Sequence, residues 1–151
     1  MTTQRKYLLP PFLKGICSQD AYSRWLHHKA AAHRRRDKKR GNLGATIEEY
    51  KIAIHKAVKK SNGMDAYTGK QLRWDLLSKY DNDASKAGGR VYKSEFSELP
   101  TVDHIGDGLG EPDFHICSWR INDAKNDLSY EEFISVCEDV LGYYKNKKGA
   151  T

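Results

Sequence analysis

Residues 102–137 read VDHIGDGLGEPDFHICSWRINDAKNDLSYEEFISVC, and they hold the most informative pattern in the chain. Two short segments rich in β-branched and aromatic residues, Pro100–Ile105 and Phe114–Cys117, predict strands on either side of a glycine-rich turn at Gly106–Pro112. The next segment, Trp119–Lys125, predicts a short helix. A hairpin followed by a helix brings residues that are remote in the sequence into one small structural unit.

Two longer helices are predicted ahead of this unit. The first begins after the capping residue Ser18 and ends near Arg40, before the Gly41–Gly44 turn. The second begins after Thr46, which forms a capping box with Glu49. Its apolar residues recur at helical spacing and predict a core-facing side: Ile47, Tyr50, Ile54, Ala57 and Val58.

The segment between the second helix and the hairpin is rich in glycine and aspartate. Leu72, Leu76 and Leu77 predict a short helix or a turn. Asp81–Gly89, with the sequence DNDASKAGG, predicts a flexible loop, and Arg90–Ser94 predicts a further strand.

After the hairpin unit, Ser129 and Glu132 form another capping box and predict a C-terminal helix. We expect this helix to bury Phe133, Val136 or Cys137, Val140 and Leu141, and the tail Lys145–Thr151 to be frayed. Helices, then a hairpin, then helices again predict an α+β domain.

Positive charge is concentrated in one segment. Residues 27–40, HHKAAAHRRRDKKR, carry seven lysines and arginines against one acid, which equals the net charge of +6 of the whole chain. Such a cationic segment on a neutral body favours a polyanionic partner, although a solvated helix face has the same composition. The residues predicted to contact nucleic-acid phosphates are Lys29, Arg34, Arg35, Arg36, Lys38, Lys39, Arg40 and Arg120. We expect the histidines of this segment, His27, His28 and His33, to face solvent or phosphate.

Composition excludes several classes of protein. The chain has 151 residues, the length of a single domain, and no apolar run approaches the length of a membrane-spanning helix. Its first residues make a poor signal peptide. Cys17, Cys117 and Cys137 are odd in number and widely spaced, which predicts reduced thiols, no structural zinc and a cytoplasmic protein.

Four polar residues of the hairpin unit predict a site for phosphodiester hydrolysis. The predicted helix packs across the hairpin and brings Asn122 close to Asp103 and His104. Carboxylate and amide oxygens are hard ligands that suit Mg²⁺ or Mn²⁺ with several waters retained. A neighbouring imidazole can deprotonate a water molecule, and Lys125 supplies a positive charge for a phosphate.

These motifs resemble those of the HNH endonucleases, also called ββα-metal or His-Me finger nucleases. Asp103-His104-Ile105 matches the first part of the family signature, and Asn122-Asp-Ala-Lys125 matches the last part. The segment Asn126–Phe133 is similar to the helix that follows the motif, and Met64–Gly69 is similar to a turn that often precedes it. The resemblance implies that His104 is the general base, that Asp103 and Asn122 hold the metal, and that Lys125 assists at the phosphate.

The chain departs from the family pattern in two places. Asp113 stands where the family has its middle asparagine, which helps to hold the catalytic histidine. An aspartate there could accept the second N–H of the imidazole as a catalytic residue, could add a carboxylate to the metal site, or could reflect an alignment shifted through the glycine-rich loop. The cysteine pairs that bind zinc in some members are also absent.

We therefore expect a Mg²⁺- or Mn²⁺-dependent HNH endonuclease that cleaves DNA. Residues 1–62 would form a basic helical region packed on the same domain, residues 63–144 the nuclease unit and residues 145–151 the frayed tail. Two alternatives remain open. One is a catalytically degenerate HNH-fold protein that only binds nucleic acid, and the other is a basic RNA-binding protein. The sequence leaves the oligomeric state open.

Overall fold

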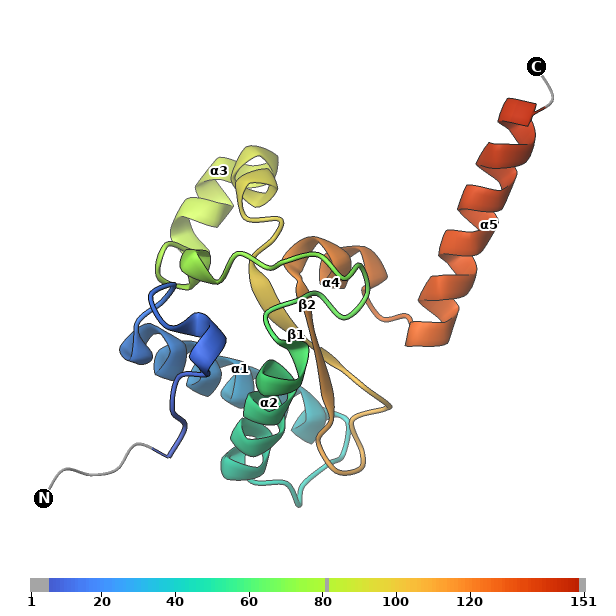
Figure 1. Ribbon diagram of the computed structural model, residues 1–151. Helices are drawn as coiled ribbons and strands as arrows, with labels where there is room; N and C mark the ends of the chain where they lie inside the picture. Colours follow the sequence, from blue (N-terminus) through green and yellow to red (C-terminus); the bar gives the residue numbers. More distant parts are fainter. Residues whose placement is uncertain (1–5, 81, 150–151) are drawn as a thin grey trace, which may run out of the picture.

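A computed structural model describes residues 6–80 and 82–149 and has an α+β fold, in which helices surround a two-stranded sheet (Figure 1). In chain order the elements are η1 (Pro11–Leu13), α1 (Gln19–Lys39), α2 (Ile47–Ser61), η2 (Trp74–Ser78), α3 (Asn82–Glu95), β1 (Pro100–His104), β2 (Phe114–Ser118), α4 (Trp119–Lys125) and α5 (Tyr130–Gly149). None of the helices in the described part of the chain combines the length and apolar character needed to cross a membrane.

The two N-terminal helices form where the sequence predicts them. Ser18 caps α1 by accepting a hydrogen bond from the backbone N–H of Ala21, and Thr46 caps α2 in the same way from Glu49. Both helices pack against the hairpin side of the molecule, where Tyr22, Ile54 and Val102 share one core. The short η2 element confirms the predicted helical turn around Leu76.

The hairpin is also confirmed. β1 and β2 pair antiparallel, from Pro100 opposite Ser118 to His104 opposite Phe114. α1 lies along β1, since the indole N–H of Trp25 donates to the carbonyl of Pro100 at 3.4 Å. α4 follows β2 directly and contacts both strands. The end of β1 is therefore enclosed between α1 and α4.

The predicted loop at Asp81–Gly89 and the predicted strand at Arg90–Ser94 are wrong. Apart from residue 81, which lies outside the described residues, both segments belong to α3. A kink at Gly89, with φ of 56° and ψ of −131°, divides this helix. Of the apolar residues that suggested a strand, Val91 is exposed, whereas Tyr92 faces a second small core and stacks on Phe96 with ring centroids 4.5 Å apart.

The C-terminal helix forms as predicted but does not pack as predicted. Its capping box is reciprocal, because Ser129 N–H donates to Glu132 Oε2 at 2.8 Å and Glu132 N–H donates to Ser129 Oγ at 3.1 Å. No residue of α5 is buried, and the helix projects away from the body (Figure 1). Only its first turns contact the body, where Tyr130 and Phe133 meet the ring of Tyr67. The expected burial of Val136 or Cys137, Val140 and Leu141 is wrong. The helix continues to Gly149 where we expected a frayed tail, and the last two residues of that predicted tail, 150 and 151, lie outside the described residues.

Candidate active site

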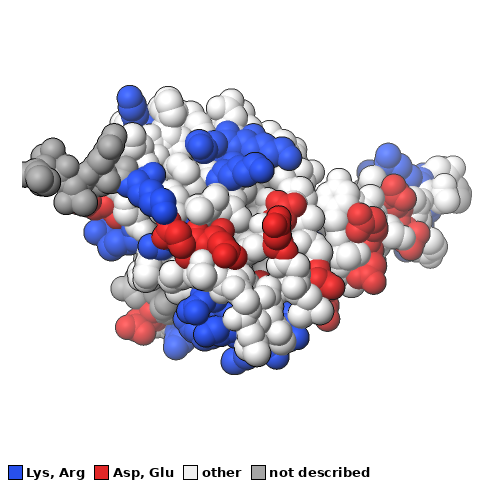
Figure 2. Space-filling model, turned by 90° about the horizontal axis from the view of Figure 1, so that it is seen from below, with Lys and Arg blue, Asp and Glu red and all other residues white. Residues whose placement is uncertain are grey.

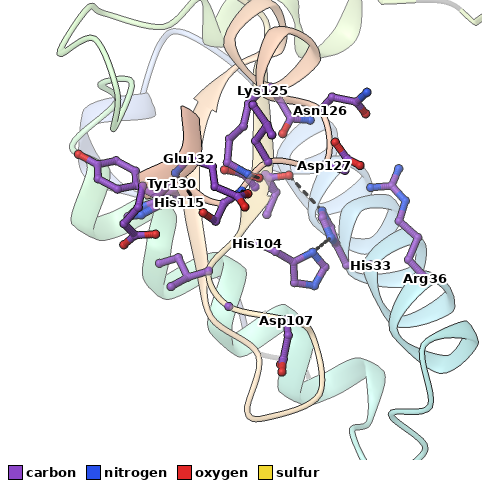
Figure 3. Close-up of a pocket in the computed structure, with 18 of the residues that line it drawn as sticks. His33, Arg36, His104, Asp107, His115, Lys125, Asn126, Asp127, Tyr130 and Glu132 are labelled. Carbon is purple, nitrogen blue, oxygen red and sulfur yellow. Dashed lines mark hydrogen bonds and ion pairs between the residues drawn. The ribbon is translucent and has the colours of Figure 1, made fainter. Parts of the chain in front are cut away.

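A cavity of about 930 Å³ opens at the end of β1. Its walls come from the C-terminal half of α1, from β1, from α4 and from the first residues of α5, so it joins segments far apart in the chain (Figure 3). Asp103, His104, Asn122 and Lys125 all line it. Four of the five residues that the sequence predicts for the catalytic and metal site are thus brought together around one space, and the fifth, Asp113, does not line it.

Asp103 lies at the back of this cavity with 6% of its surface exposed. One carboxylate oxygen lies 3.3 Å from Nζ of Lys125, whose side chain is also buried, and the other accepts a hydrogen bond from the Tyr67 hydroxyl. Burial, and then the hydrogen bond to Asp103, raise the pKa of Tyr67 above its ordinary value, so this hydroxyl remains a donor. In this structure Lys125 neutralises Asp103 and does not point to solvent.

His104 is held from the side by a carboxylate that sequence reasoning missed. Its Nε2 lies 2.9 Å from Oδ2 of Asp37, which is 1% exposed, and the Tyr50 hydroxyl donates to the same oxygen at 2.6 Å. The other oxygen of Asp37 faces the hairpin turn, where a Cβ added at Gly108 would lie only 2.6 Å from it. Gly108 has a φ of +80°, so the turn combines a glycine conformation with a close approach to this carboxylate.

The second contact of His104 is with another histidine of α1, His33. The two Nδ1 atoms are 3.1 Å apart, and Nε2 of His33 donates to the carbonyl of Val102 at 3.1 Å. The expectation that His33 faces solvent is wrong, because it is 3% exposed. Burial, and then the positive charge of His104, lower the pKa of His33 to about 2.

These hydrogen bonds determine where the hydrogens lie. His33 is neutral and carries its hydrogen on Nε2, so its Nδ1 can only accept. The hydrogen between the two rings therefore belongs to His104. Nε2 of His104 lies against the carboxylate of Asp37, so both ring nitrogens of His104 have protein partners.

Asp113 does not occupy the position at the imidazole that one interpretation gave it. Its side chain is exposed and accepts a hydrogen bond from the N–H of Phe114 at 3.0 Å. Its backbone carbonyl accepts from the N–H of Ile105 at 2.9 Å and closes the hairpin turn. Asp37 provides the carboxylate that contacts His104.

The residues predicted to contact phosphate are dispersed. Lys29 points into the fold and donates to Thr101 Oγ1 at 3.0 Å, and burial lowers its pKa to about 8. Arg36 and Arg40 line the cavity, whereas the others do not: Arg34, Arg35, Lys38, Lys39 and Arg120. Lysines and arginines gather beside a band of acidic residues on the face shown in Figure 2.

Two residues of the cavity carry the oxygen donors that a hard cation such as Mg²⁺ prefers. Among the described residues, no group of three or more His, Cys, Asp or Glu side chains is placed to hold a metal ion. Asp103 and Asn122 line the same cavity from β1 and from α4, and they supply one carboxylate and one amide oxygen. Mg²⁺ is commonly bound through one or two carboxylates, with water and phosphate oxygens completing its six ligands.

Comparisons with known proteins find no relative of this chain. Neither a scan against models of protein families nor searches of curated proteins and of solved structures finds a match for this chain. The resemblance to the HNH endonucleases therefore rests on the motif residues of the sequence alone.

One signal for the missed residues was present in the sequence. Lys29, His33 and Asp37 are spaced four residues apart, so they lie on one face of α1. That face also carries Trp25, which is buried against β1. If the buried face of α1 is extended from Trp25 toward the C-terminal end of the helix, it includes His33 and Asp37, and this predicts that both lie inside the fold.

Proposed function

We propose that this protein is a Mg²⁺- or Mn²⁺-dependent endonuclease of the HNH type that hydrolyses DNA phosphodiester bonds. The observation that supports this most strongly is the convergence of Asp103, His104, Asn122 and Lys125 on one cavity between the hairpin and α4. This set provides a base, two oxygen ligands and a cation, which are the groups that phosphodiester hydrolysis requires.

His104 is the proposed general base, and Asp37 is its positioning residue. To accept a proton from water, His104 must present a bare Nδ1, so the contact with His33 must open and the ring must carry its hydrogen on Nε2. Asp37 accepts that Nε2 hydrogen, which sets the tautomer and leaves Nδ1 free to take a proton from water. Water must enter between His104 and His33, on the side where His104 lines the cavity.

Asp103 and Asn122 would hold the metal ion, which stabilises negative charge on the phosphate and on the leaving oxygen when it is bound. Lys125 contacts the carboxylate oxygen of Asp103 at 3.3 Å. When that oxygen serves as a ligand, the ammonium group of Lys125 becomes available to a phosphate oxygen. Lys125 therefore pairs with the carboxylate of Asp103 in this structure and would pair with a substrate phosphate when Asp103 binds the metal.

The test is cleavage of supercoiled plasmid in Mg²⁺, in Mn²⁺ and in EDTA. We expect cleavage only with a divalent ion, and His104→Ala should reduce the rate by about 10²- to 10⁴-fold, the contribution of a general base. His115→Ala is the matched control, because His115 lines the same cavity but has no proposed role. A His104→Ala protein that cleaves as fast as the unchanged chain would refute the assignment of the base.

A second candidate is a protein of the same fold that binds nucleic acid without cutting it. Two contacts favour it: both ring nitrogens of His104 have protein partners, and Asp103 is paired with Lys125. Metal-independent binding of DNA, together with intact plasmid under all three conditions, would establish this candidate instead.

A further inference from the structure

A second cavity, of about 630 Å³, adjoins the first. The two share four lining residues: His33, Arg36, Val102 and Asn122. The second cavity extends from this shared wall along α1 toward its N-terminal half, between α1 and the loop that carries Tyr80. The two cavities are therefore direct neighbours on the two sides of these residues.

The two cavities differ in charge. The first is lined by several carboxylates: Asp103, Asp107, Asp123, Asp127, Glu131 and Glu132. Among the described residues, no aspartate or glutamate lines the second cavity, whereas Arg24, Lys29 and Arg36 do. His28 adds a further nitrogen base to this wall. The second cavity therefore favours an anion.

Aromatic side chains complete the second cavity. Tyr80 and Trp119 line it and meet edge to face, with ring centroids 5.3 Å apart, and both remain partly exposed. Cationic grooves with aromatic side chains bind single-stranded nucleic acid, because phosphates meet the cations and bases stack on the rings. The volume lies in the range that encloses a small ligand, so it admits a short piece of one strand and not a paired duplex.

We propose that the second cavity binds the unpaired nucleic-acid strand next to the phosphate in the first cavity. Arg24 and Arg36 contact backbone phosphates, and Trp119 stacks on a base. Lys29 supports the cationic wall from within, where it donates to Thr101. The position of this strand relative to a cleaved bond rests on the proposed function, but the binding of the strand does not.

The experiment measures binding in EDTA, so that cleavage does not enter. Fluorescence anisotropy of a labelled single-stranded DNA is compared for Arg24→Ala and for Lys56→Ala. Each variant removes one positive charge from a helix, but Lys56 is exposed on α2 and lines neither cavity. Arg24→Ala should weaken binding about tenfold and lower the salt slope by about one, whereas Lys56→Ala should change affinity less than about twofold.

A second measurement locates the base. Stacking should quench the fluorescence of Trp119. Trp25 also lines this cavity but is only 9% exposed, and Trp74 is 0% exposed in the core, so Trp119 should account for most of the quenching. In Trp119→Phe the quenching by single-stranded DNA should disappear while the fold, followed by circular dichroism, remains. A duplex hairpin of the same composition should bind more weakly and quench less.

The outcomes separate this proposal from the proposed function. Equal affinities of Arg24→Ala and Lys56→Ala, or tighter binding of the duplex than of the single strand, would overturn the strand site even in an active nuclease. Binding that depends on Arg24 and quenches Trp119, in a protein that leaves plasmid intact with Mg²⁺ and Mn²⁺, would uphold the strand site and overturn only the proposed hydrolysis.

Discussion

The helices α1 and α5 are similar in length, with 21 and 20 residues, but α1 is partly buried in the fold and α5 is not. α1 is crowded with lysine, arginine and histidine, yet it buries seven residues and contacts the hairpin along its length. α5 carries a row of apolar residues, yet none of them is buried. The difference shows that the burial of a helix depends on whether one of its faces has residues to contact, and not on the average composition of the helix.

For α1, that face continues from apolar to polar without a break. Trp25, Lys29, His33 and Asp37 each contact β1, the first three through hydrogen bonds to its first three residues. Buried polar groups are tolerated when each has a partner. α5 has the caps of a stable helix but, after Phe133, no surface of the body to cover.

The largest expected effect is the loss of the carboxylate on the inner face of α1. Asp37→Ala leaves the imidazole ring of His104 and the hydroxyl of Tyr50 without their partner, and each buried polar group left unsatisfied costs about 1–3 kcal/mol. Urea denaturation followed by circular dichroism measures the free energy of unfolding. Asp139→Ala on α5 is the control and should change it by less than about 0.5 kcal/mol. Similar small effects of the two variants would show that the Asp37–His104 contact does not stabilise the fold.

Two leucine variants test whether apolar residues of α1 and α5 differ in their contribution to stability. Leu26 in α1 is 1% exposed and Leu141 in α5 is 50% exposed. Leu26→Ala should lower the free energy of unfolding by about 2–5 kcal/mol, since it leaves a cavity in the core. Leu141→Ala should change it by less than about 0.5 kcal/mol. A destabilisation by Leu141→Ala as large as that by Leu26→Ala would mean that α5 has a packing partner in solution.

The same contrast explains what could be predicted from the sequence. The caps at Ser18, Thr46 and Ser129 depend on residues within one helical turn, so local patterns locate these helix starts. The hairpin and the residues of the motif could be placed for a similar reason, because β1, β2 and α4 follow one another with short connections.

What the sequence missed depends on contacts between distant segments. Asp37 and His104 are 67 residues apart, and nothing near either residue shows that they meet. The kinked helix α3 was missed because its two adjacent glycines are typical of a loop. The contacts of Tyr92 and Phe96 with an aromatic cluster cannot be seen in the sequence. The exposure of α5 was missed because an apolar face predicts burial only when a partner surface is present.

The smallest expected effect concerns the pH dependence of the inner face of α1. The pKa of His33 is lowered to about 2 in the folded chain and is about 6.5 in an unfolded one. Below about pH 6.5 the unfolded chain binds a proton that folded His33 does not, so this residue makes stability fall as the pH decreases toward 2. Its contribution to the slope is about 1.4 kcal/mol per pH unit and vanishes above about pH 6.5.

His33→Gln removes this titration, and it keeps a side-chain donor that can reach the carbonyl of Val102. Urea midpoints measured from pH 4.5 to pH 8 should therefore depend less on acid in His33→Gln than in the unchanged chain. The control is His27→Gln, which alters an exposed histidine of the same helix and should leave the slope unchanged. If both variants kept the full acid dependence, His33 would be accessible to protons in the folded state, and the inner face of α1 would be as open to solvent as α5.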